Sequence, residues 1–163
     1  MSNVEITKDI ANGTLVVTSV FAATPERVWR LWADPRQLER WWGPDPYPAT
    51  VVDHDLRPGG HVSYYMTGPD GDQHKGYWHI TEVDPPHHLA FEDGFADSDG
   101  EPNEELPVSR SEVTIERVDD ARTRLTITSV YDTSAELEQV LAMGMEQGIR
   151  AAVEQIDALL AEG

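Results

Sequence analysis

The C-terminal stretch from Thr133 to Ala161 limits the folds open to this chain more than any other segment. Its apolar residues recur at spacings of three and four and form one stripe along a helix: Leu137, Leu141, Met145, Ile149, Val153, Ile156 and Leu160. Thr133 or Ser134 can cap the start of this helix. The spacing therefore predicts a single helix that spans a whole small domain and buries one face.

Two glycines, Gly144 and Gly148, lie one turn apart beside this stripe. Each costs roughly 1 kcal/mol relative to alanine in a helix interior, so the space they leave needs a reason. A strand packed close to the helix is one reason, and room for a ligand over the middle of the helix is the other. The sequence leaves both open.

The residues before this helix predict two short helices and a series of antiparallel strands. Thr14 to Ala22 is apolar or β-branched on both faces, which is typical of a strand covered on both sides for part of its length. Thr24-Pro25-Glu26 and Asp34-Pro35 are helix starts, and the second helix ends at Gly43-Pro44. Turn residues then separate strands near 48–56, 61–67, 74–83, 87–93, 108–118 and 122–131.

The loop of the first hairpin decides which side chains face inward. A three-residue loop, Pro58-Gly59-Gly60, places Arg57 opposite His61. This register puts two polar side chains, His54 and Tyr64, on an inner face that is otherwise made of Val52, Leu56, Val62 and Met66. The opposite parity would turn His54 outward.

Composition and charge limit the partners. A chain of 163 residues fits one domain, residues 1–163 with a core over about 14–160. The 30 acidic and 12 basic residues give a net charge of −18, which repels phosphates and anionic lipids, so we expect neither nucleic acid nor a membrane as partner. Part of the acidity lies in residues 93–107, an aperiodic stretch that predicts an exposed loop; the alternative is that Phe95 and Leu106 fold back over the mouth of a cavity. No stretch resembles a leader or a membrane span, and we expect a cytoplasmic protein.

The residue types that usually carry chemistry form no known catalytic or metal-binding motif. The chain has no cysteine, and no serine stands in a nucleophile-elbow pattern. Its six histidines show no spacing typical of a zinc site. We therefore expect no metal and no cofactor, and we assign no catalytic residue.

Several short motifs follow one another in a characteristic order: Ala23-Thr24-Pro25-Glu26-Arg27-Val28-Trp29, Trp41-Trp42-Gly43-Pro44, Asp55-Leu56-Arg57-Pro58-Gly59-Gly60, Glu82-Val83-Asp84-Pro85-Pro86, Thr123-Arg124-Leu125-Thr126-Ile127-Thr128 and Gly148-Ile149. Together they resemble the family named after the activator of the heat-shock protein 90 ATPase, within the START and birch-pollen-allergen superfamily. The resemblance covers roughly Thr14 to Leu160. The chain departs from the family at Ile149, where tryptophan is common, and at Ser129, where histidine is frequent.

The resemblance implies an α+β helix-grip fold. In such a fold a curved antiparallel sheet of about seven strands wraps around a long C-terminal helix, two short helices follow the first strand, and an apolar cavity lies between sheet and helix. Proteins with similar folds bind lipids, sterols, polyketides or toxins, assist cyclisation, or act as co-chaperone domains, so the fold does not fix one activity.

The favoured expectation is that the cavity binds a hydrophobic or aromatic small molecule. One alternative is a co-chaperone-like interaction module; the other is a cavity enzyme of cyclase or hydrolase type, with His54 as acid or base beside Tyr64. A heat-shock ATPase partner is not favoured, and a homodimer is left open.

We predict a ligand-binding set made of Trp42, His54, Tyr64, Met66, Phe91, Leu141, Met145 and Ile149. In this set His54 and Tyr64 would orient the ligand, and the apolar members would supply affinity. The competing interpretation of His54 is a core histidine that bonds to the backbone and has no ligand near it.

Overall fold

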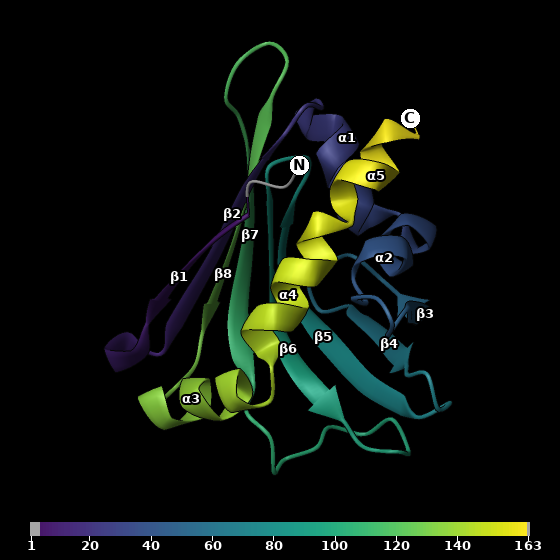
Figure 1. Ribbon diagram of the computed structural model, residues 1–163, viewed down its shortest axis with the longest axis vertical. Helices are drawn as coiled ribbons and strands as arrows, with labels where there is room; N and C mark the ends of the chain where they lie inside the picture. Colours follow the sequence, from purple (N-terminus) through teal and green to yellow (C-terminus); the bar gives the residue numbers. More distant parts are fainter. Residues whose placement is uncertain (1–3, 163) are drawn as a thin grey trace.

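An antiparallel sheet of eight strands wraps around the C-terminal helices in the computed structural model, which describes residues 4–162 (Figure 1). Residues 1–3 and 163 of the expected domain lie outside the described residues. The strand order is β1-β2-β8-β7-β6-β5-β4-β3. The strands are β1 Glu5–Asp9, β2 Thr14–Phe21, β3 Ala49–His54, β4 His61–Thr67, β5 Gln73–Asp84, β6 His88–Ala96, β7 Ser109–Arg117 and β8 Thr123–Val130. The α+β helix-grip architecture is the one that the sequence predicted.

The first predicted strand, β2, pairs with the last one, β8. β2 runs antiparallel to β8, with Val17 opposite Ile127. Alternate residues of β2 are buried, so Leu15, Val17 and Phe21 face the core. β1 was not predicted; it adds to the free edge of β2, with Ile6 opposite Val17. A five-residue strand with one apolar residue, Ile6, gives too short a pattern to identify from the sequence.

The two short helices, α1 (Pro25–Ala33) and α2 (Pro35–Trp41), begin at the predicted positions. Thr24 Oγ1 accepts a hydrogen bond from the Arg27 amide at 3.2 Å, and Asp34 Oδ1 accepts one from the Arg36 amide at 2.9 Å. Proline follows each cap in the first helical turn, where its missing N–H is not needed.

The C-terminal helix is not continuous, which corrects the single helix predicted from Thr133 to Ala161. It consists of α3 (Ser134–Ala142), α4 (Met145–Glu154) and α5 (Ile156–Ala161). Gly144 has a φ of 92° and ends α3, because glycine adopts this left-handed conformation without the clash of a Cβ atom. The chain turns there, so that α3 points away from the direction of α4 and α5 (Figure 1).

The first hairpin also differs from its predicted register. His54 lies opposite Val62, and the Asp55 amide donates to the His61 carbonyl at 3.0 Å, so the connection is longer than three residues. Its glycines are held by β5: the Gly59 amide donates to the Ile80 carbonyl, and the Ile80 amide donates to the Gly60 carbonyl, both at 2.9 Å. A shift of register between Val51 and Asp53 turns Val52 outward, where it is 62% exposed.

Candidate functional site

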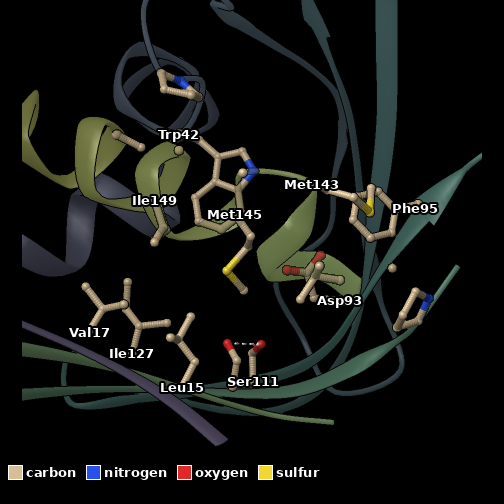
Figure 2. A pocket seen from close by; sticks show the side chains of 18 of the residues that line it. Leu15, Val17, Trp42, Asp93, Phe95, Ser111, Ile127, Met143, Met145 and Ile149 are labelled. Atoms are coloured by element: carbon tan, nitrogen blue, oxygen red, sulfur yellow. Dashed lines mark hydrogen bonds between the residues drawn. The ribbon is translucent and has the colours of Figure 1, made fainter. Parts of the chain in front are cut away.

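A cavity of about 260 Å³ lies between the concave face of the sheet and α4. Its floor is formed by alternate residues of β2, β6, β7 and β8, which point to the same side of the sheet. Its roof is one face of α4, where Met145, Gly148, Ile149 and Ala152 recur at helical spacing. Figure 2 shows Met145 and Ile149 facing Val17, Leu15 and Ile127 across this space.

A cluster of aromatic rings forms one wall. Trp42 and Phe91 line the cavity, and Trp78 lies behind both of them. The Trp78 and Phe91 rings stack with centroids 4.2 Å apart, whereas Trp42 meets Trp78 edge to face at 5.0 Å. Such contacts hold both rings in defined orientations, so this wall of the cavity is preformed.

Gln155, between α4 and α5, fixes the backbone around Trp42. Its side-chain amide donates to the carbonyls of Trp41 and Gly43, each at 3.0 Å, and its Oε1 accepts from the Asp45 amide at 3.1 Å. Three hydrogen bonds from one side chain thus join the segment after α2 to the C-terminal helices. The roof and the aromatic wall are therefore held as one unit.

A row of serine hydroxyls crosses the floor. Ser111 Oγ lies 3.1 Å from Ser129 Oγ on the neighbouring strand, and 3.1 Å from Ser109 Oγ on its own strand (Figure 2 draws the first of these bonds). Ser111 and Ser129 line the cavity and are buried. Because these hydroxyls bond to one another, they are tolerated on an otherwise apolar surface.

Asp93 places a carboxyl group in the same cavity. It stands on β6 opposite Ser109 of β7, and its side chain lines the cavity, with the carboxyl group beside the Met145 side chain (Figure 2). Among residues 4–162 no hydrogen bond or ion pair reaches its carboxylate oxygens. Burial away from water raises the pKa of Asp93 to about 7, because nothing nearby compensates for the lost hydration of the charged form.

Two phenols share the electrostatic environment of Asp93. Burial raises the pKa of Tyr64 well above its ordinary value and also raises that of Tyr131, and the negative charge of Asp93 adds to both shifts. Both phenols therefore stay neutral at physiological pH. In the described part of the chain, no lysine, arginine or histidine lines the cavity. No cationic side chain there balances the negative charge of Asp93.

The mouth of the cavity lies where the α3–α4 link approaches the connection between β6 and β7. Met143 of the link lines the cavity and is 53% exposed. Phe95 and Pro107 line the cavity from the other side of this opening, and Figure 2 shows Phe95 beside Met143. The connection itself carries exposed acidic residues: Asp97, Asp99, Glu101, Glu104 and Glu105.

Most of the predicted ligand-binding residues meet at this cavity. Six of them line it: Trp42, Tyr64, Met66, Phe91, Met145 and Ile149. Leu141 packs against the core from α3 instead, because the break at Gly144 takes α3 out of line with α4; Val140 reaches the cavity in its place. Gly148 also lines the cavity, and a Cβ atom there would find only Pro44 Cγ, 3.9 Å away. The space beside Gly148 therefore belongs to the cavity and not to a tightly packed strand.

His54 does not line the cavity. Its Nε2 donates to the Trp32 carbonyl at 2.9 Å, in the last turn of α1, where carbonyl groups lack partners within the helix. The side chain thus bonds to the backbone, as in the competing interpretation of His54 as a structural histidine. Because His54 lies outside the cavity, it cannot serve there as the acid or base of the cavity-enzyme hypothesis.

The most polar cavity residue, Asp93, was missed by the sequence analysis. Residues 93–107 were predicted as an exposed loop, but β6 continues to Ala96 and carries Asp93 on its inner face. The available signal was the alternation of Leu89, Phe91, Asp93 and Phe95, in which an acid occupies an apolar position. The acidic, glycine-containing stretch that follows hid this pattern.

The described residues hold neither a cluster of metal-ligating side chains nor a membrane-spanning helix. No three histidine, aspartate or glutamate side chains between residues 4 and 162 gather as metal ligands would. Over the same residues, no helix combines the length and the apolar character needed to cross a bilayer.

The fold and the cavity define the chain as a helix-grip protein, and comparison with known proteins gives its family. A family model described as "Activator of Hsp90 ATPase homolog 1-like protein" matches residues 22–161. The chain belongs to this family, whose members generally bind ligands in a cavity. No curated protein sequence matches the chain.

Solved structures agree with this assignment. The chain is similar to a protein from Mycobacterium smegmatis, with 52% identity, a TM-score of 0.89 and coverage of 96% of each chain. It is also similar to a protein from Arthrobacter aurescens, with 45% identity, a TM-score of 0.93 and coverage of 98% of this chain and 92% of the other. A protein of the same family name from Silicibacter pomeroyi shares the fold at 24% identity, with a TM-score of 0.73 and coverage of 91% and 97%.

Proposed function

We propose that this protein binds an apolar or aromatic small molecule in the cavity between the sheet and α4. The observation that carries the proposal is the cavity itself: about 260 Å³, lined mainly by aliphatic and aromatic side chains, with a few polar groups. Pockets of this composition are typical of small-molecule sites. The family to which the chain belongs generally binds ligands in such a cavity.

The walls of the cavity suit a ligand with a flat or irregular apolar surface. Trp42 and Phe91 supply rigid ring faces, whereas Met66, Met143 and Met145 supply flexible thioethers. Methionine adapts to irregular shapes at little cost, and fixed aromatic rings give a ligand large contact area. In this proposal the apolar lining provides affinity, and the polar groups of the floor provide orientation.

Filling the cavity tests the proposal. Gly148→Leu places a branched side chain in the space under α4, and we expect it to weaken binding of the neutral probe 2-naphthalenemethanol by at least about tenfold, roughly 1.4 kcal/mol. Isothermal titration calorimetry of the folded parent and variant measures this. Gly148→Ala is the matched control, since its single methyl group lies 3.9 Å from Pro44 Cγ and leaves most of the space open.

Met145→Trp fills the same space from a second position of the roof. Both filling variants must first be shown to fold, by near-ultraviolet circular dichroism. If both keep their fold and bind the probe as tightly as the parent, the cavity under α4 is not the binding site.

A further inference from the structure

The cavity holds one ionisable group that its apolar surroundings do not explain. The Asp93 carboxylate has no hydrogen-bond or ion-pair partner within residues 4–162, although it faces the space bounded by Met145 and the serine row. An acid in this position destabilises the folded protein unless something compensates for its lost hydration. A leucine or methionine would fill the same site without that cost.

We propose that Asp93 is the recognition group for a basic amine, so that the ligand of this cavity is an apolar molecule carrying one protonated nitrogen. This inference rests on the proposed function and adds the chemical class of the ligand. An ammonium group would supply the opposite charge and the hydrogen-bond donors that the carboxylate lacks in the unliganded protein.

No described side chain around Asp93 supplies the positive charge that would pair with its carboxylate. The phenols of Tyr64 from β4 and of Tyr131, which follows β8, line the same cavity as Asp93, whereas Tyr77 of β5 lies opposite Gly94 on the other face of the sheet. The charge of Asp93 contributes to the raised pKa of all three phenols. All three phenols are neutral at physiological pH, and no cationic side chain lines the cavity in the described residues. The position opposite the carboxylate is therefore open to a cation from outside.

Charge also favours access of a cation over access of an anion. The connection next to the mouth carries five exposed acidic residues, Asp97, Asp99, Glu101, Glu104 and Glu105, and the whole chain has a net charge of −18. A negative potential at the opening raises the local concentration of cations and lowers that of anions. The same potential, with Asp93 inside, works against fatty acids and other apolar carboxylates.

Ionisation of Asp93 couples binding to pH. With its pKa raised to about 7 by burial, Asp93 is mostly protonated at pH 6 in the free protein. An ammonium group beside it favours the carboxylate, so binding of an amine at pH 6 releases close to one proton, whereas binding of an uncharged molecule releases none. Affinity for the amine accordingly rises between pH 6 and pH 8.

Two isosteric probes test the inference: 2-naphthalenemethylamine, which is a cation, and 2-naphthalenemethanol, which is neutral. Calorimetric titration of the parent at about pH 8 is expected to give at least about tenfold tighter binding of the amine. Asp93→Asn should remove this preference, so that the amine and the alcohol bind the variant with similar affinity. Asp99→Asn, the control, makes the same change in net charge on the exposed connection and should retain the preference. Titrations at pH 6 in buffers of different ionisation enthalpy should give proton release for the amine in the parent and none in Asp93→Asn.

The outcomes separate the two proposals. If the alcohol binds and the amine binds no more tightly, recognition of an amine by Asp93 is wrong and the apolar cavity site stands. If Asp93→Asn keeps both the preference and the proton release, another group recognises the amine and the inference fails. If the folded parent binds neither probe, both proposals fail.

Discussion

Asp93 makes the stability of the folded protein depend on pH in a direction opposite to that of most carboxylates. Its pKa is raised from 3.8 to about 7 in the folded chain, so over this interval the unfolded chain ionises first and folding stability falls as pH rises. Below the lower value both states are protonated and no stability is lost. Above about pH 7 the loss is nearly complete, and at 1.36 kcal/mol for each pKa unit it amounts to at most about 4 kcal/mol, because the surface of Asp93 is only partly buried.

Asp93→Asn removes this ionisation. We expect the difference in free energy of unfolding between variant and parent to move in favour of the variant by up to about 2 kcal/mol between about pH 5.5 and about pH 8. Urea denaturation at both pH values, without ligand, measures it. A difference that stays constant with pH would mean that Asp93 is not held in an apolar environment.

His54 supports the end of α1, and its loss should affect stability and leave binding unchanged. In His54→Ala the Trp32 carbonyl loses its donor at 2.9 Å, which costs about 1–3 kcal/mol. Urea denaturation should show this loss, while calorimetry with 2-naphthalenemethanol should give the parental affinity. The exposed His79 provides the control, since His79→Ala should change stability by no more than about 0.5 kcal/mol. Weaker probe binding in folded His54→Ala would instead connect this residue to the cavity.

Residue placement was the part of the site that the sequence predicted least well. Alternation identifies the inner faces of β6 and β8, and Phe91 lines the cavity from the inner face of β6. In β2, apolar or β-branched residues stand on both faces, so the sequence wrongly indicated a strand covered on both sides, whereas only alternate residues are buried. The inner face of β3 depends on the irregularity between Val51 and Asp53 and on the hydrogen bonds from Gly59 and Gly60 to β5. Such long-range bonds leave no periodic signal, so the orientation of His54 could not be predicted from one hairpin alone.

At the scale of elements, the sequence predicted which helices and strands are present, and in which order, better than it predicted whether a helix is continuous. Helix caps at Thr24 and Asp34 and the turn residues between strands act locally, and the structure has α1, α2 and the strands that follow them where these signals stand. The apolar stripe of the C-terminal segment continues across Gly144, and periodicity does not report the conformation of a single residue. The break therefore appears only in the structure.

The two helix glycines should respond to the same substitution with opposite signs. Gly144→Ala places a Cβ atom on a residue with a φ of 92°, which costs about 1–2 kcal/mol. Gly148→Ala lies within α4, has ordinary contacts, and should stabilise the protein by up to about 1 kcal/mol. Urea denaturation of the two variants measures both effects. Equal changes of one sign would show that the chain does not break its helix at Gly144 in solution.

At the scale of the whole molecule, the excess of acidic residues sets the response to salt. A net charge of −18 on a chain of this size produces repulsion in the folded state that is stronger than in the expanded unfolded chain. Screening at about 0.5 M salt shortens the Debye length to a few ångström, so the melting temperature should rise from about 0.01 M to about 0.5 M NaCl. Differential scanning fluorimetry at fixed pH measures this. The same rise with KCl is expected, and a fall with both salts would mean that the ion pairs outweigh the repulsion.

The serine row beneath Asp93 can reverse its direction. Each hydroxyl of Ser109, Ser111 and Ser129 can act as donor or as acceptor in the two bonds that join them, so rotating all three O–H bonds keeps the number of hydrogen bonds unchanged. The row can therefore present a hydrogen atom to one ligand and a lone pair to another at the same place. A floor of this kind tolerates exchange of polar groups on a ligand, so the serine row does not discriminate between such ligands, and the carboxyl group of Asp93 beside it does.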